Sequence, residues 1–149
     1  MATEVIKKPF LPIDSMITAY CDGACSGNPG PMGIGIVLWK NGEKIKEISE
    51  FIGKGTNNIA EYNAALRALE EAKKLGEKEV IIRSDSQLLI KQLNREYKIK
   101  ETHLKPLKLK IDELCLEIHA KFEHVERERN KRADYLSKRA ISNETNNKP

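Results

Sequence analysis

The chain contains 149 residues, with a formal net charge of +4, 40% hydrophobic residues and 32% charged residues. This length and composition are typical of one soluble globular domain, and they exclude a disordered chain. The longest apolar run, residues 34–39, is too short to cross a bilayer, so we expect no membrane partner. The mild positive charge permits a polyanionic partner without requiring one.

Cysteine usage predicts the compartment. The three cysteines, Cys21, Cys25 and Cys115, are an odd and sparse set, which does not form a disulfide framework. No second Cys/His pair stands at zinc-ligand spacing beside the first two. We therefore expect reduced thiols in a cytoplasmic protein, with a monomer as the default oligomeric state.

The two ends of the chain differ from its middle. Residues 1–15 contain two prolines and no apolar signal segment, and they are predicted to form a flexible leader. Residues 143–149 are polar and are predicted to form a flexible tail. Residues 16–142 are expected to form one domain.

The first half of this domain predicts three strands followed by a helix. The strands are expected at residues 16–22, 33–40 and 43–53. Asn41-Gly42 favours a tight hairpin between the last two strands, because both residues tolerate positive φ. Apolar side chains recur at helical spacing over residues 58–76, with Gly76 at the end.

The second half alternates strands and helices. Strands are expected at residues 79–85 and 121–126, and helices at residues 86–94, 102–120 and 130–142. A hairpin meander followed by this alternation predicts an α/β fold, in which a mixed sheet is covered by helices.

Two carboxylates in the first half have more than one interpretation. Asp22 follows Thr18 and Tyr20 on one face of the first strand, and it is either a turn residue or a functional residue at the strand end. Glu61 lies early in the first helix. It either completes a capping box that begins at Asn58 or leans over the sheet toward a site.

Two further carboxylates lie in the second half. Asp85 ends a strand and precedes a helix, so it is either an N-cap or a site residue at the carboxyl end of the strand. Asp134 lies in the first turn of the last helix and could simply pair with Lys138.

The four carboxylates together suggest metal chemistry. If the strands that carry Asp22 and Asp85 are parallel neighbours, then Glu61 and Asp134 could converge on the same sheet edge. Four close carboxylates repel one another and need cations to stay ionised. Oxygen ligands suit Mg²⁺, with Mn²⁺ as a substitute, and a pair of such ions suits phosphodiester hydrolysis.

Four motifs resemble those of the ribonuclease H type 1 family. They are CDGACSGNPGPMGIGIVLW, TNNIAEYNAALRALEEA, IRSDSQLLIKQLN and NKRADYLSKRA, and the likeness covers residues 16–141. The resemblance implies a ribonuclease H-like fold with a five-stranded mixed β-sheet flanked by helices. It also implies an endonuclease that cuts the RNA strand of RNA/DNA hybrids and leaves 3′-hydroxyl and 5′-phosphate ends.

The resemblance also assigns residue roles. Two Mg²⁺ ions would be held by Asp22, Glu61, Asp85 and Asp134, with Asp22 bridging both. Polar contacts to the minor groove of the hybrid would come from Asn28, Asn57 and Gln87. A phosphate of the DNA strand would be held by Thr56 and Lys54. Without the resemblance, these five residues are ordinary turn, pre-helix and first-turn residues.

The sequence departs from the family pattern before the last helix. Many members carry a histidine in a longer loop, whereas no histidine lies between Val125 and Asp134. The chain thus resembles the short-loop form seen in archaeal and some bacterial members, where His124, Arg127 or Glu128 could take the helper role. Residues 92–110 are basic but hold Tyr97 as their one aromatic residue.

The sequence also bears on three other functions. A catalytically silent hybrid-binding module would not need all four carboxylates. Double-stranded RNA is a possible side substrate, because its helix shares A-like geometry with the hybrid. The nuclease domain of a reverse transcriptase is disfavoured, because no polymerase is attached.

Overall fold

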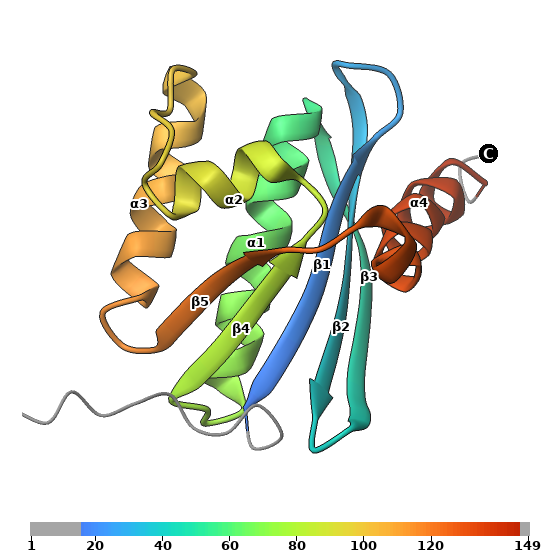
Figure 1. Cartoon of the computed structure of the whole chain (residues 1–149). Helices are drawn as coiled ribbons and strands as arrows, with labels where there is room; N and C mark the ends of the chain where they lie inside the picture. Colours follow the sequence, from blue (N-terminus) through green and yellow to red (C-terminus); the bar gives the residue numbers. More distant parts are fainter. Residues whose placement is uncertain (1–15, 147–149) are drawn as a thin grey trace, which may run out of the picture.

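The computed structural model describes residues 16–146. The predicted leader, residues 1–15, lies outside the described part. One five-stranded sheet has the order β3-β2-β1-β4-β5 (Figure 1). Its strands are β1 (Ile17–Cys25), β2 (Gly30–Lys40), β3 (Glu43–Gly55), β4 (Glu79–Ser84) and β5 (His119–His124). The α-helices are α1 (Asn57–Lys74), α2 (Gln87–Leu93), α3 (Lys105–Leu114) and α4 (Lys131–Asn146), with 3₁₀ turns at Thr102–Leu104 and Arg127–Arg129.

The sheet is mixed, as the sequence predicts. Strand β1 runs antiparallel to β2 and parallel to β4, and β4 runs parallel to β5. The strand that carries Asp22 and the strand that ends just before Asp85 are therefore parallel neighbours. The tight hairpin is also confirmed, since Asn41 and Gly42 both have positive φ, at 54° and 75°.

Helices cover the two faces of the sheet unequally. Helices α1, α2 and α3 lie on one side, and α4 lies alone on the other (Figure 1). Helix α1 packs with small side chains and a few large ones, and its fully buried members include Ala60, Ala64, Tyr62 and Leu69. Most of the apolar core therefore lies between α1 and the sheet. No helix among residues 16–146 is long and apolar enough to span a membrane.

Several predicted element boundaries were wrong, and they include those of β2, β3 and β5, which were predicted at residues 33–40, 43–53 and 121–126. Strand β1 does not stop at Asp22, because its pairing with β2 continues to Cys25 opposite Met32. The helix predicted over residues 102–120 ends at Leu114, since Ile118 is buried and His119 already donates its backbone N–H to Lys78. Helix α4 continues to Asn146, so residues 143–146 of the predicted tail are helical.

Glycines let two helices approach the sheet closely. A Cβ on Gly35 would lie 2.1 Å from the Ala133 carbonyl oxygen, and one on Gly33 would lie 2.2 Å from that of Ser137. Helix α4 therefore rests directly on the backbone of β2. On the other side, a Cβ on Gly23 would lie 2.2 Å from the carbonyl carbon of Ala60 in α1.

The close contact between α4 and the backbone of β2 leads to a prediction about stability. Gly35→Ala would force α4 away from β2, because the nearest atoms are backbone and cannot rotate aside. We expect the free energy of unfolding to fall by about 1–3 kcal/mol, measured by urea denaturation. Leu116→Ala is the control, since this side chain is 87% exposed and its loss should cost under about 0.5 kcal/mol. Equal stability of the two variants would contradict the close-contact argument.

Candidate functional site

Asp22 lies on β1, two residues beyond Tyr20, the last residue of β1 that pairs with β4. The parallel ladder stops at Tyr20 opposite Arg83, whereas Asp22 faces Gly35 across the antiparallel ladder. The Asp22 side chain is buried, with only 5% of the residue exposed. Ser137 on α4 donates its hydroxyl to Asp22 Oδ2 at 3.0 Å. The carboxylate is therefore fixed between the sheet and α4, within a strand and not in a turn.

Glu61 lies in the second turn of α1, and the capping-box interpretation is wrong. The N-cap is Thr56, whose hydroxyl accepts from the Ile59 backbone N–H at 3.3 Å. Glu61 is thus free of a capping role. Its Oε2 accepts from the backbone N–H of Gly23 at 3.3 Å. The close approach of α1 to β1 at this glycine brings Glu61 beside Asp22.

Asp85 follows β4 directly and does not cap α2. That role belongs to Ser86, whose hydroxyl accepts from the Leu89 backbone N–H at 3.2 Å. The Asp85 side chain is 14% exposed, and its Oδ2 lies 4.0 Å from Nε of Arg127. Asp85 therefore projects from the carboxyl end of its strand, where α/β sheets commonly place ligands.

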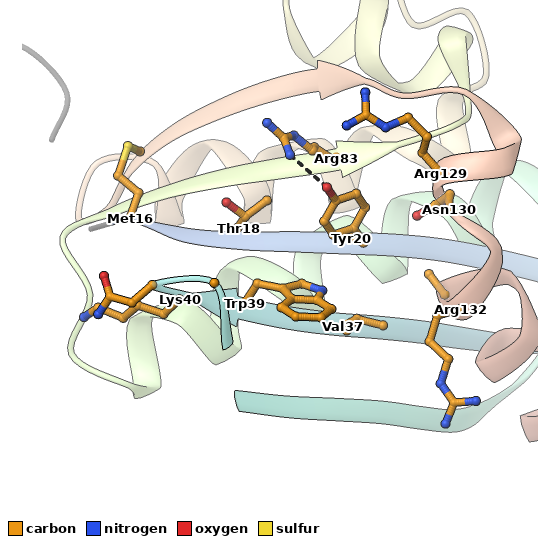
Figure 2. Close-up of a pocket in the computed structure, with 13 residues that line it drawn as sticks. Met16, Thr18, Tyr20, Val37, Trp39, Lys40, Arg83, Arg129, Asn130 and Arg132 are labelled. Atoms are coloured by element: carbon orange, nitrogen blue, oxygen red, sulfur yellow. Dashed lines mark hydrogen bonds between the residues drawn. The ribbon is translucent and has the colours of Figure 1, made fainter. Parts of the chain in front are cut away.

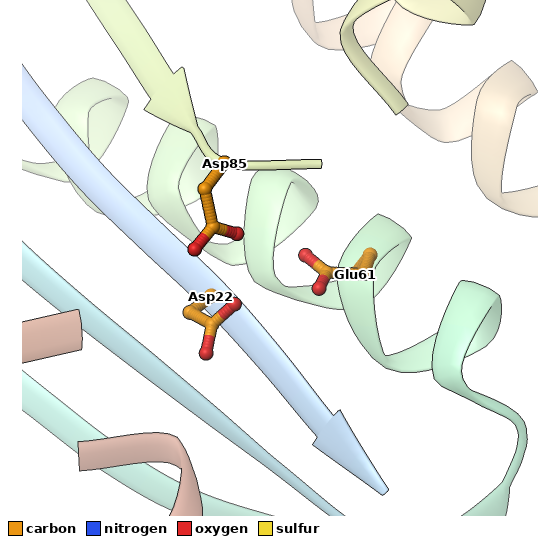
Figure 3. A group of neighbouring side chains, drawn as sticks. All are labelled: Asp22, Glu61 and Asp85. Atoms are coloured by element: carbon orange, nitrogen blue, oxygen red, sulfur yellow. The ribbon is translucent and has the colours of Figure 1, made fainter. Parts of the chain in front are cut away.

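The three carboxylates form one cluster. One oxygen each from Asp22, Glu61 and Asp85 lies within 4.8 Å of the others, and the side chains point toward a common centre (Figure 3). We call this group the carboxylate triad. It draws on β1, α1 and the end of β4, so only the folded chain brings it together.

Asp134 stands beside the triad without belonging to it. Its Oδ2 accepts from Nζ of Lys138 at 3.1 Å, which is the helical ion pair that the sequence suggested. Asp134 also helps to raise the pKa of Asp22, through a side-chain hydrogen bond and through its charge. The predicted convergence of four carboxylates is therefore tight for three of them, with the fourth at the margin.

The electrostatics of the triad are unfavourable without a cation. Burial, followed by the charge of Asp85, raises the pKa of Asp22 to about 7. Burial raises the pKa of Glu61 well above its usual value, and the charges of Asp22 and Asp85 add to this. Burial also raises the pKa of Asp85, against the opposing effect of Arg127. A divalent cation among these oxygens would reverse all three shifts, so the donor set fits a metal ion that prefers oxygen ligands.

Two supporting residues were missed in the sequence. Ser137 holds Asp22, and Asn130 donates its side-chain N–H to the backbone carbonyl of Cys21 at 3.0 Å. Both are buried polar residues in or next to α4. Ser137 follows Asp134 by three residues and therefore shares its helix face, which was an available signal. Nothing local marks the long-range bond of Asn130.

The predicted substrate-binding residues lie on exposed or half-buried surface near the triad end of the sheet. Asn28 Oδ1 accepts from the Asn57 backbone N–H at 3.1 Å, so the β1–β2 loop is tied to the start of α1. Lys54 lies on β3 two residues before the cap Thr56. Gln87 is the first residue of α2 and is exposed. Their contacts with substrate stay predictions.

Comparison with known proteins identifies the family. A family model described as reverse transcriptase-like matches residues 20–140. A ribonuclease H of Chlorobium phaeobacteroides is 35% identical, over 85% of this chain and 96% of that protein. The crystal structure of RNase H1 from the archaeon Halobacterium salinarum is similar, with a TM-score of 0.83 at 37% identity, over 87% of this chain and 99% of that chain. The chain therefore belongs to the ribonuclease H family.

One similar structure contains nucleic acid. LC11-RNase H1, isolated from compost, was crystallised with an RNA/DNA hybrid. It is 42% identical to this chain with a TM-score of 0.82, over 87% of this chain and 99% of that one. Three mycobacterial proteins are 36% identical over 84% of this chain, but the chain spans only 35% of their length.

The raised pKa of Asp22 predicts a pH dependence of stability. The folded pKa, about 7, lies above the ordinary value of 3.8, so the folded protein binds this proton more tightly than the unfolded chain does. In EDTA, stability should therefore fall as pH rises between these two values and level off above them.

Asp22→Asn removes the titrating carboxyl group, and with it the loss of stability at high pH. The side-chain amide oxygen can still accept a hydrogen bond from the Ser137 hydroxyl. At about pH 8 in EDTA, its free energy of unfolding should exceed that of the wild type by on the order of 2 kcal/mol, and the gain should shrink toward about pH 4. Urea denaturation at several pH values measures both. A pH-independent difference between the two proteins would refute the assignment.

Proposed function

We propose that this protein is an endonuclease that hydrolyses the RNA strand of RNA/DNA hybrids. The observation that carries the proposal is the carboxylate triad, formed by oxygens within 4.8 Å of one another in a chain of the ribonuclease H family. The likeness to a ribonuclease H crystallised with an RNA/DNA hybrid supports this substrate. A double-stranded RNA side activity is the finer expectation, because both duplexes have A-like grooves.

The metal site would consist of Asp22, Glu61, Asp85 and Asp134. Carboxylate oxygens with room for water suit Mg²⁺, with Mn²⁺ as a substitute. We propose that this donor set would hold two ions, and Asp22 is the member of the triad that also interacts with Asp134. Such ions would supply Lewis-acid activation of a water and charge stabilisation of the leaving 3′ oxygen, which would give 5′-phosphate and 3′-hydroxyl ends.

The chain itself would supply orientation and charge. The Ser137 hydroxyl and the Gly23 N–H each hold one carboxylate, so little reorganisation is needed when substrate arrives. Arg127 is 88% exposed and lies 4.0 Å from Asp85. Of the three candidates His124, Arg127 and Glu128, we propose Arg127 as the substitute for the loop histidine. A cation at this position can contact a phosphate as well as a carboxylate.

Recognition of the hybrid would use the exposed polar residues around the triad. We propose that Asn28, Asn57 and Gln87 contact the minor groove, where the 2′-hydroxyl distinguishes RNA from DNA. The start of α1 would meet the DNA strand, with Thr56 and Lys54 at one phosphate. The hydrogen bond between Asn28 and Asn57 supports this proposal, since it holds two of these residues on one surface.

The protein is further proposed to act as a cytoplasmic monomer, with residues 16–142 as its ribonuclease H domain. The three cysteines are free thiols in the structure, which is consistent with a reducing compartment.

A cleavage assay tests the activity directly. One labelled RNA sequence is presented as RNA/DNA hybrid, as double-stranded RNA and as single strand, beside the matching DNA duplex. We expect internal cuts in the RNA of the hybrid with Mg²⁺ or Mn²⁺ and none in EDTA. Binding of the hybrid without cutting at any metal concentration would favour a hybrid-binding module instead.

Asp22→Asn tests the metal assignment. It removes one negative ligand, so the rate of hybrid cleavage should fall at least about a hundredfold, which corresponds to about 2.7 kcal/mol of activation free energy. Asp112→Asn is the matched control, because Asp112 pairs with Lys108 away from the triad. Near-normal cleavage by Asp22→Asn would refute the site.

Gln87→Ala tests whether Gln87 helps to recognise the ribose 2′-hydroxyl in the minor groove. The side chain is exposed, so folding should be unaffected, whereas the preference for hybrid over DNA duplex in binding should weaken by up to about tenfold for one lost hydrogen bond. Asn143→Ala, an exposed amide on α4, is the control. A preference unchanged by Gln87→Ala would remove this residue from the interface.

A further inference from the structure

A groove lies on the α4 side of the sheet, outside the carboxylate triad. Its volume is about 520 Å³, and it occupies the part of this face that α4 leaves uncovered (Figure 2). The floor is formed by side chains of β1, β2 and β4, and one end is formed by the segment that leads into α4. Its lining includes Tyr20, Trp39, Arg83, Arg129, Asn130 and Arg132.

The floor of the groove carries two aromatic rings. Tyr20 on β1 and Trp39 on β2 lie on adjacent strands, and Trp39 is 37% exposed (Figure 2). The guanidinium of Arg83 lies 5.6 Å from the centre of the Tyr20 ring and donates to the Tyr20 hydroxyl at 2.8 Å. Arg83 is held in turn by Glu123 at 3.0 Å. These contacts fix the Tyr20 ring, and the Trp39 ring beside it is partly exposed.

Cationic groups border the same groove at its α4 end. Arg132 donates from Nε and Nη2 to the carboxylate of Glu47, at 2.6 and 2.8 Å. A guanidinium has five N–H donors, so this pair orients Arg132 and leaves donors for an anion. Arg129 is exposed and has no ion-pair partner among residues 16–146. The α4 end of the groove therefore has cationic donors available.

An unsatisfied acceptor lies at this end of the groove. Asn130 is 1% exposed, and its Oδ1 has no hydrogen-bond partner, the one such buried side-chain atom in the described part of the chain. Figure 2 shows this oxygen turned toward Tyr20 and the groove. A buried acceptor without a partner costs free energy, and a donor entering the end of the groove would relieve that cost.

The groove adjoins the triad along β1. Tyr20 and Asp22 are alternate residues of one strand, so their side chains share a face and lie about 7 Å apart along it. The hydrogen bond from Asn130 to Cys21 marks the boundary between groove and triad. Arg129 and Arg132 stand on the segment that forms this boundary.

We propose that this groove binds single-stranded nucleic acid. Bases would stack on Trp39 and Tyr20, and phosphates would meet Arg129 and Arg132. Flat rings beside arginines are the features that bind a single strand without sequence preference, because every base has a stacking face. That such a strand is the unpaired extension of a hybrid substrate rests on the proposed function, whereas the binding itself does not.

The sequence supplies a reporter for the test, because Trp39 is the single tryptophan of the chain. The probe is oligothymidylate of about ten nucleotides, added to the full chain in EDTA so that no metal-dependent cleavage takes part. We expect saturable quenching of Trp39 fluorescence, with an affinity that falls as salt rises. Anisotropy of the labelled oligonucleotide gives the affinity independently.

Four variants localise the binding by anisotropy. Trp39→Ala should weaken the affinity about fivefold or more, and Trp39→Phe should restore most of it, since stacking needs only a ring. Arg129→Ala should lower the slope of log affinity against log salt by about 0.7, the value for one phosphate contact of a single strand. Arg139→Ala, an exposed arginine of α4 that does not line the groove, should leave affinity and quenching within about twofold, in contrast to Arg129→Ala.

Three results would overturn the proposal. The first is no binding of the oligonucleotide, and the second is binding without any change in Trp39 fluorescence, which would place the strand elsewhere. The third is quenching by thymidine monophosphate with the same affinity, which would reduce the groove to a nucleotide pocket. Each result is independent of hybrid cleavage, so a failure here leaves the proposed nuclease activity to its own assay.

Discussion

The close approach of like charges is the constraint on which the rest of the site depends. Three carboxylates come within 4.8 Å of one another, and burial, followed by the charge of Asp85, raises the pKa of Asp22. The fold holds them there by glycine contacts: Gly23 admits α1 to β1, and Gly35 admits α4 to β2. Rigid backbone contact on both sides of the sheet thus maintains a group of charges that would separate in a looser structure.

The two faces of the sheet differ in the side chains that they contribute to the core and to the site. The α1 face carries most of the apolar core and supplies Glu61. The α4 face is only partly covered, and it supplies Asp134, Ser137 and the basic end of the groove. Stability therefore rests mainly on one face, whereas the other face keeps an open groove with arginines at one end.

The sequence predicts the parts of this structure that local patterns control. The Asn41-Gly42 turn follows from turn chemistry, and the mixed sheet follows from chain order and motif resemblance. That β1 and β4 are parallel neighbours was only a condition in the sequence argument, and three of the four expected carboxylates form the triad. The cap of α1 was misassigned because Asn58 and Thr56 are both acceptable cap residues, and only tertiary contact decides between them. The Asn130 bond to Cys21 spans more than a hundred residues, and no local pattern encodes such a contact.

The late position of α4 in the chain has a consequence for synthesis. The three residues of the triad have all been synthesised once the chain has passed β4 and Asp85, whereas Asp134 and Ser137 lie on the last element described. A nascent chain on the ribosome therefore contains the triad residues before it contains the residues that steady Asp22. Until α4 emerges and settles on the glycines of β2, the growing polypeptide lacks Asp134 and the hydrogen bond that Ser137 donates to Asp22.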